Sequence, residues 1–399
     1  MEPSRKHLAK VSHRSFNPGV LVVLGLGIFL ALALRLSLFD FESFDYQWAL
    51  SHWYDFIVSN GGFSALGYEF GDYTPLYLYL LTLGTYLPLP KLYAIKLISI
   101  SFDLLLAFFV LLIVRLKYEN KVVWISSFFV TLFAPTVFIN SALWGQSDAT
   151  YTSMLVASIY FAIRQRLNLS LLFFSIALAF KLQAVFLFPV FVVLFLKGRV
   201  PIHYFLIIPA TYMISIIPAW LLGRPLMELL LIYPAQAAHY KGLTLNAPTL
   251  YQWLPNDLLF EKPGLVLAAL LAGLLCLVSW RSAVPLDGEM IVKLSLVSVL
   301  LLPFTLPHMH ERYFFAADVI SIIYAFYSPK RFFIPLVVGA ASLFSYFPFL
   351  FGEDPTIMNP DGLQYLAILM GAALIIATTD LIKRLYPNLL EQLRSESPD

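Results

Sequence analysis

The chain has 399 residues, of which 60% are hydrophobic and only 13% are charged, and its mean hydropathy is +0.79. In soluble domains about a quarter of all residues are charged, so this composition indicates a polytopic membrane protein. The net charge of +2 comes from basic residues dispersed through short loops, which argues against a nucleic-acid partner. The lone Cys276 excludes an intramolecular disulfide and a cysteine-based metal site.

The first apolar segment, 20–38, follows a basic stretch and is long enough to cross a hydrocarbon core of about 30 Å. A signal peptide would have a shorter apolar core and a small-residue cleavage site, so we expect an uncleaved first helix. The positive-inside rule then places residues 1–19 in the cytoplasm as a tail.

Further apolar segments predict an all-α, polytopic fold with about twelve transmembrane helices in a single membrane-embedded domain, residues 1–399. The Lys and Arg clusters between these segments all fall on one side if both chain ends are cytoplasmic, with 383–399 as the second tail. The expected spans are 20–38, 94–116, 122–143, 149–163, 167–181, 183–196, 202–222, 263–280, 290–306, 313–328, 333–351 and 363–382.

Two of these spans, 167–181 and 183–196, form a short hairpin. The second has about 14 residues and rises only about 21 Å at 1.5 Å per residue. The tip around Lys181 is therefore expected below the outer membrane surface. A shorter apolar segment, 75–88, is bounded by prolines and is predicted to be an interfacial helix on the outer side.

The first external loop, 39–93, begins with a run that no lipid-spanning helix can contain. The part Phe39–Leu80 carries Asp40, Asp45, Asp72 and three further acidic residues among several Trp and Tyr side chains. Aromatic faces cover the apolar side of a sugar while carboxylates bind its hydroxyls, so the pattern favours a carbohydrate site. An amphipathic loop on the membrane surface explains the same composition equally well.

The same topology brings four further polar segments to the outer side, although it rests on Lys and Arg counts alone. These segments are 144–148, the tip at Lys181 and Gln183, the second external loop 223–262, and 307–313. A single outward-facing polar site explains this set better than five unrelated solvated loops.

The last of these segments, 307–313, places ionisable residues between two apolar spans, where such groups usually face a cavity or a partner. Arg312 with His308 and His310 could hold a phosphate through charge-assisted hydrogen bonds, and Lys181 would reach the same place from its hairpin tip. The HxHE spacing that ends at Glu311 is also compatible with a metal site. No HExxH motif or carboxylate triad accompanies it, so we expect no metal.

Two aspartates, Asp103 and Asp318, fall inside expected spans near their outer ends. Lys96 precedes Asp103 by two helical turns, so we expect a structural ion pair or a supporting role for Asp103 rather than a catalytic one. The segment Trp144–Asp148 fits two interpretations. It could be a tight turn with Trp144 as a membrane-interface anchor, or it could bind a sugar.

A succession of motifs in this chain resembles one enzyme family. It runs from Asp45-Tyr46 and Trp53-Tyr54 through DYTPLYLY (72–79), NSALWGQSDATYTS (140–153) and FKLQAVFLFP (180–189) to PHMHERYFFAAD (307–318). In this order the motifs look like the bacterial relatives of GPI mannosyltransferase II, which are membrane-embedded GT-C glycosyltransferases that use polyprenyl-phosphate sugars. They are more distantly similar to the ER glucosyltransferases that use dolichyl-phosphate glucose. Thr74 stands where the DYPP-like motif of those enzymes has its first Pro.

The resemblance implies a GT-C-like fold and an inverting transferase that moves a hexose, mannose first and glucose next, from a polyprenyl-phosphate donor. The implied acceptor is a lipid-linked or surface glycan, and the resemblance implies no cofactor and no metal. The implied location is the external face of a bacterial plasma membrane, where the protein is surrounded by membrane lipids. Asp45 would be the base, favoured over Asp40 by the spacing to Trp53, and Asp72 would orient it or the acceptor. The implied donor-phosphate residues are Lys181, His308, His310 and Arg312, and the implied sugar and acceptor residues are Trp144, Gln146, Asp148, Tyr73, Gln183 and Glu311.

The main alternative is a polytopic transporter or a flippase for lipid-linked sugars, because twelve spans with both ends inside is a common transporter layout. Transporters usually show internal repeats and a pair of broken helices at corresponding positions. The sequence shows neither, and a large acidic outer loop is not needed for transport.

Overall fold

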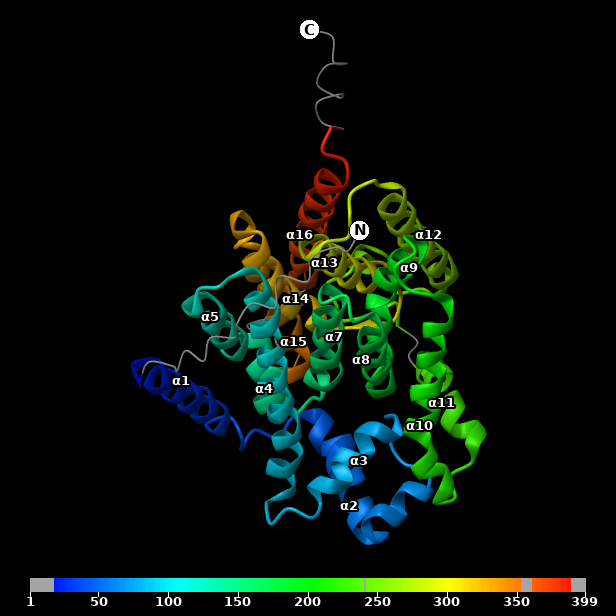
Figure 1. Ribbon diagram of the computed structural model, residues 1–399. Coiled ribbons are helices and arrows are strands. Elements are labelled where there is room, and N and C mark those ends of the chain that lie inside the picture. Colours follow the sequence, from blue (N-terminus) through cyan, green and yellow to red (C-terminus); the bar gives the residue numbers. More distant parts are fainter. Residues whose placement is uncertain (1–17, 240–241, 353–360, 389–399) are drawn as a thin grey trace, which may run out of the picture.

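The computed structural model describes residues 18–239, 242–352 and 361–388, and within these ranges the chain is almost entirely helical (Figure 1). The α-helices are α1 (Pro18–Leu36), α2 (Ser51–Ser59), α3 (Pro75–Gly84), α4 (Lys91–Lys117), α5 (Lys121–Leu132), α6 (Pro135–Phe138), α7 (Asp148–Ile163), α8 (Leu167–Phe180), α9 (Phe188–Leu196), α10 (Ile207–Leu221), α11 (Leu226–His239), α12 (Glu261–Arg281), α13 (Gly288–Thr305), α14 (Phe315–Tyr327), α15 (Ile334–Phe351) and α16 (Gly362–Leu385).

Short helical turns of two other kinds connect these helices. Two are π-helical, η1 (Tyr46–Leu50) and η3 (Ile139–Trp144). The 3₁₀ turns are η2 (Gly62–Gly67), η4 (Leu182–Leu187), η5 (Ile202–Leu206), η6 (Leu250–Trp253), η7 (Leu258–Phe260), η8 (Glu311–Phe314) and η9 (Pro329–Arg331).

Seven helical segments of the described chain are long and apolar enough to cross a membrane, which confirms an all-α protein of the membrane type. They are α1, α4, η5 with α10, η7 with α12, α13, η9 with α15, and α16. An eighth is added if α5 and the α6–η3 segment count as one span, although these two are bent by 46°.

Every one of the twelve expected spans lies on helix, but twelve crossings are not confirmed. The remaining helices are short: α7 has 16 residues, α8 has 14 and α14 has 13. At 1.5 Å per residue they rise only about 20–24 Å, less than a hydrocarbon core of about 30 Å. Most side chains of α7 and α14 are buried, so both helices are surrounded by protein.

The expected span 122–143 is broken between α5 and α6. Pro135 begins α6, and proline disfavours a helical conformation at the residue before it. Ala134 is accordingly extended, with φ −62° and ψ 124°. The chain therefore changes direction by 46° just before the polar segment at Trp144.

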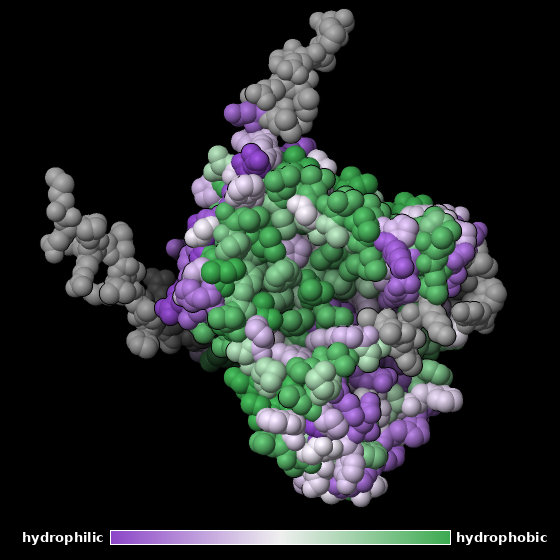
Figure 2. Space-filling model, turned by 90° about the vertical axis from the view of Figure 1, so that its right-hand side faces the viewer, coloured by the Kyte–Doolittle hydropathy of each residue, from purple (hydrophilic) through white to green (hydrophobic). Residues whose placement is uncertain are grey.

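Apolar and polar surfaces lie at different levels of the molecule. Figure 2 shows a face on which hydrophobic residues cover the upper and middle parts, whereas hydrophilic residues gather toward the lower end. Figure 1 places α2 and α3 at that lower end, away from the C-terminal end of α16. The segment 39–93, expected to be an external loop, thus forms a cap of short helices at one end of the bundle.

The segments 223–262 and 307–313, both expected on the outer side, are joined by a short backbone ladder that the sequence analysis did not anticipate. Strand β1 (Thr244–Leu245) pairs in parallel with β2 (Met309–His310), in the register Thr244 to Met309 and Leu245 to His310. This pairing fixes the start of the segment that carries Glu311 and Arg312.

The charged residues inside the helices pair differently from expectation. Asp103 of α4 binds Arg35 of α1, with Arg35 Nη2 2.9 Å from Asp103 Oδ2, and it also accepts a hydrogen bond from Ser141. Lys96 does not pair with Asp103; its ammonium donates to the backbone oxygens of Leu38, Phe39 and Phe41 at 2.7–3.1 Å. The expected structural role is seen for both residues, but with other partners.

Candidate functional site

The first polar residue of the site, Asp45, lies immediately before η1 at the entrance to the segment that continues into α2. Its Oδ2 atom accepts a hydrogen bond of 2.9 Å from Trp144 Nε1 and a second one from Gln146 Nε2. Arg312 Nη1 lies 3.8 Å from the same oxygen. Three residues from two distant segments thus hold one carboxylate that keeps 24% of its side chain exposed.

A second carboxylate, Asp148, begins α7 and is almost completely buried. Lys181 Nζ donates to Asp148 Oδ1 at 2.7 Å, and Asn140 Nδ2 donates to Oδ2 at 2.8 Å. Arg312 Nε lies 3.9 Å from Oδ2. An acidic side chain in the first turn of a helix is also stabilised by the helix dipole.

Arg312 lies between these two carboxylates and connects them. It also donates through Nη1 to Glu311 Oε1 at 3.2 Å, and its Cζ lies 5.6 Å from the ring centre of Trp144. Its Nε has no hydrogen-bond partner among the described residues. Because a guanidinium has five N–H donors, Arg312 can bind a further oxygen without losing its present contacts.

Tyr73 and Gln146 close the other side of the site. The Tyr73 hydroxyl donates to Gln146 Oε1 at 3.2 Å, while the other end of the same amide donates to Asp45. Lys181 Nζ lies 4.9 Å from the ring centre of Tyr73, within the range of a cation–π contact. We refer to the eight residues Asp45, Tyr73, Trp144, Gln146, Asp148, Lys181, Glu311 and Arg312 as the polar cluster.

The backbone at Trp144 explains why this segment can present three polar side chains. The preceding turn η3 is π-helical, a conformation that is frequent at functional sites. Gly145 ends this turn with φ +80°, a backbone angle that residues other than glycine rarely adopt. Gln146 N then bonds to the Asn140 carbonyl at 2.9 Å, so the chain folds back and α7 starts at Asp148.

Burial changes the protonation of two groups in the loop that follows β2. It raises the pKa of Glu311 to about 7, against the opposing effect of Arg312, with Asp45 and Asp148 raising it further. It lowers the pKa of His310 to about 2, with Arg312 and Lys181 acting in the same direction. His310 is therefore neutral near pH 7, so it supplies no positive charge for the phosphate clamp suggested by the sequence.

Five of the sequence-derived candidates are not part of the polar cluster: the neutral His310, which lies beside Glu311, and the four residues His308, Asp40, Asp72 and Gln183. His308 adopts φ +63° and its Nδ1 lies 2.7 Å from the Gly242 carbonyl, in the segment 223–262. Asp40 is exposed and bonded to the Tyr93 hydroxyl. Asp72 is exposed, and Gln183 is half-buried in η4, where it follows Lys181.

The sequence analysis grouped the segment 223–262 with the other polar segments but named neither Asn140 nor any residue of 223–262 as a site residue. Asn140 stands inside the quoted NSALWGQSD motif, and its eight-residue spacing from Asp148 would have been a usable signal only with the π-helical turn known. Gln236 of α11 donates to the Asp72 carbonyl, a contact between distant segments that no local pattern indicates.

The donor set of the polar cluster determines what it can bind. It offers two carboxylates, a carboxyl group with pKa about 7 and two buried cations, which suits an anion together with hydroxyl groups. Among the described residues, no three His, Cys, Asp or Glu side chains are grouped so that they could hold a metal ion. No protein-family model matches the chain, and no curated protein shows significant similarity to its sequence.

Proposed function

We propose that this protein is an inverting glycosyltransferase of the GT-C type that moves a hexose from a polyprenyl-phosphate donor to an acceptor at the external face of a bacterial plasma membrane. The observation that carries the proposal is the position of Asp45. Its partly exposed carboxylate is held by Trp144 and Gln146 while the guanidinium of Arg312 lies 3.8 Å away. A base and a phosphate-binding cation thus lie side by side.

In the proposed reaction, an acceptor hydroxyl attacks the anomeric carbon as the bond from that carbon to the phosphate oxygen breaks. Asp45 takes the proton of the hydroxyl, a role that typically contributes about 10²- to 10⁴-fold in rate. The bonding electrons leave with the polyprenyl phosphate. Arg312 and Lys181 stabilise the charge that develops on this leaving group.

The assignment of Asp45 over Asp40 is supported by their surroundings. Asp45 faces Trp144, Gln146 and Arg312, whereas Asp40 is bound to Tyr93 at an exposed position. The role suggested for Asp72 has less support, because its side chain is exposed and none of the cluster residues is bonded to it. Mannose as the transferred sugar, with glucose next, rests on the family resemblance alone.

A groove elsewhere in the bundle supports the use of a lipid-linked donor. It has a volume of about 880 Å³ and lies between α5, α14 and α15, where its lining is almost wholly apolar. Thr136 and Asp318 contribute the polar groups in this lining. We propose that the groove accommodates the prenyl chain of the donor.

The second candidate is a transporter or flippase of lipid-linked sugars. The observation that favours it is the break between α5 and α6, because broken helices form the substrate sites of many transporters. Such a protein would move a labelled lipid-linked sugar across a vesicle membrane without breaking the bond to the phosphate.

The decisive experiment incubates the purified full-length protein in detergent with a panel of polyprenyl-phosphate hexoses and a membrane lipid extract as the acceptor source. We expect consumption of one donor and release of free polyprenyl phosphate by the native protein, and neither with Asp45→Asn. Reconstituted vesicles with labelled donor provide the second arm. Movement of intact donor without any released phosphate would support the transporter and contradict the transferase.

A further inference from the structure

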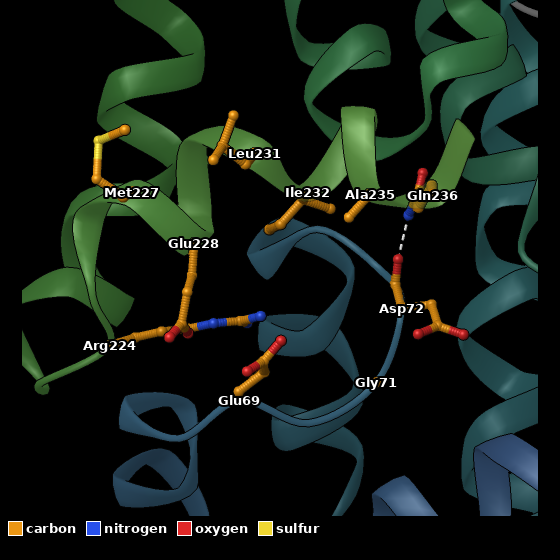
Figure 3. Close-up of a pocket in the computed structure, with 10 residues that line it drawn as sticks. All are labelled: Glu69, Gly71, Asp72, Arg224, Met227, Glu228, Leu231, Ile232, Ala235 and Gln236. Atoms are coloured by element: carbon orange, nitrogen blue, oxygen red, sulfur yellow. Dashed lines mark hydrogen bonds between the residues drawn. The ribbon is translucent and has the colours of Figure 1, made fainter. Parts of the chain in front are cut away.

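A pocket of about 380 Å³ lies between the segment Glu69–Asp72 and the helix α11 (Figure 3). Arg224, Glu228 and Gln236 line one wall, and Glu69 lies opposite them. The pocket adjoins the polar cluster through the chain, because Tyr73 follows Asp72 directly. The Asp72 carboxylate itself points away from Arg224 in Figure 3.

Arg224 is the residue that makes this pocket unusual. Its side chain is only 3% exposed, yet its Nε has no hydrogen-bond partner, and no ion pair of its guanidinium occurs within the described chain. Burial lowers the pKa of Arg224, against the opposing effect of Glu69 and Glu228. A buried guanidinium without partners is costly, so a site that keeps one is expected to bind a ligand there.

Two neighbouring tyrosines do not satisfy Arg224, although both lie close to it. The Tyr79 hydroxyl donates to the Ser215 carbonyl and accepts from Ala219 N. The Tyr212 hydroxyl donates to the Leu229 carbonyl. The Tyr79 contacts join α3 to α10 and the Tyr212 contact joins α10 to α11, and neither hydroxyl is bonded to Arg224.

Glu228 is the complementary group, because its Oε2 atom is buried in the same pocket and no described residue is hydrogen-bonded to it. Gly223, with φ +114°, lets the chain turn from α10 toward α11, so that Arg224 lies just before the helix that carries Glu228. A ligand that satisfies both must accept from the guanidinium and donate to the carboxylate. A hydroxyl group does both, and neighbouring hydroxyls of a sugar ring can serve all these groups at once.

The net charge of the pocket selects against other ligands. Glu69 and Glu228 outnumber the single cation Arg224. A phosphate would meet two carboxylates and one cation, so the donor phosphate belongs with Lys181 and Arg312. The apolar side chains of Leu231 and Ile232 complete the lining and suit the C–H face of a pyranose ring.

We propose that the pocket binds the sugar of the acceptor, with neighbouring hydroxyls accepting from Arg224 and donating to Glu228 and Glu69. The term acceptor rests on the proposed transferase function; sugar binding itself does not. The pocket would hold the acceptor sugar on the Asp72 side of Tyr73, while the donor phosphate lies on the Lys181 side.

The test uses the full-length protein in detergent and saturation-transfer-difference NMR with methyl α-D-mannopyranoside and methyl α-D-glucopyranoside as probes. We expect a signal from at least one glycoside, and no signal from 2-methoxytetrahydropyran, which has the same ring without hydroxyls. Arg224→Met and Glu228→Gln should each weaken binding about 10-fold or more, because each removes a hydrogen bond to a charged group. Asp55→Asn, an exposed acidic position of the same loop paired with Lys91, is the matched control and should bind like the native protein.

Because Arg224 is buried, Arg224→Met could lose its fold. The conservative variant Arg224→Lys and the variant of the exposed Glu69, Glu69→Gln, therefore provide a second measurement of glycoside binding in folded proteins. The pocket proposal is overturned if both glycosides give no signal with the native protein, or if all four variants bind them normally. It is also overturned if O-phosphoethanolamine displaces the glycosides, since the pocket would then bind a lipid headgroup. Donor consumption is measured separately and reports on the transferase. Normal glycoside binding without donor consumption would contradict the transferase function alone. Donor consumption without glycoside binding would contradict the pocket proposal alone.

Discussion

The ammonium group of Lys181 lies 2.7 Å from the carboxylate of Asp148, with 9% and 1% of the two side chains exposed. Removing one partner leaves the other as a buried charge, which typically costs about 3–5 kcal/mol. We expect Lys181→Met and Asp148→Asn each to lower the free energy of unfolding by about 3 kcal/mol, and the double variant to lose clearly less than the sum. Unfolding in detergent followed by circular dichroism measures all four proteins; strictly additive losses would show that the two residues are not coupled.

The proposed base is tested by comparing Asp45→Asn with Asp40→Asn. The first keeps the shape of the side chain but cannot take a proton, so turnover should fall by about 100-fold or more, or about 3 kcal/mol. Donor binding should barely change, because Arg312 and Lys181 hold the phosphate. Asp40→Asn should leave turnover near the native value; if it is the inactive variant, the catalytic carboxylate is Asp40.

The raised pKa of Glu311 predicts a pH dependence of stability. Between its usual value of 4.5 and about 7, the folded protein binds a proton that the unfolded chain has lost. The contribution of this group is therefore fully present below pH 4.5 and is lost as the pH rises through about 7, by about 3 kcal/mol in total. Thermal unfolding at a series of pH values should show a smaller fall over this range for Glu311→Gln; parallel curves for the two proteins would contradict the assignment.

The expected orientation is tested by single cysteines in a Cys276→Ala background. Asn60 follows α2, Gly352 follows α15 and Glu119 lies between α4 and α5. The topology expected from the sequence puts the first two outside and the third inside. An impermeant thiol reagent added outside intact cells should label cysteines at 60 and 352 and spare one at 119. The reverse pattern would place the polar cluster in the cytoplasm.

Chelation tests whether a divalent metal takes part. His308 is turned to the Gly242 carbonyl and Glu261, whereas His310 lies beside Glu311 and Tyr313, so the two imidazoles do not converge. We expect turnover to be unchanged after exhaustive treatment with EDTA. Loss of turnover that manganese or magnesium restores would identify a metal site that these side chains join.

The helices were predictable because long apolar runs are a local signal, and each expected span indeed lies on helix. The partners of the charged residues could not be predicted, because they depend on contacts between segments that are distant in the sequence. Arg35 and Asp103 are 68 positions apart, and Lys96 binds backbone carbonyls, which no side-chain pattern reveals. His308 was grouped with Arg312 by spacing, but its positive φ turns it to the other loop.

The contact between Arg35 and Asp103 has a consequence for how the chain enters the membrane during synthesis. α1 emerges from the ribosome first and carries Arg35 in its last turn, before the helix that holds Asp103 has been made. An unpaired Arg near the end of an apolar helix keeps its charge among the lipid headgroups, because a position deeper in the bilayer is costly. We therefore expect α1 to stay shallow until α4 has been made and Asp103 pairs with Arg35, so that the final depth of α1 is set only after α4 has been inserted.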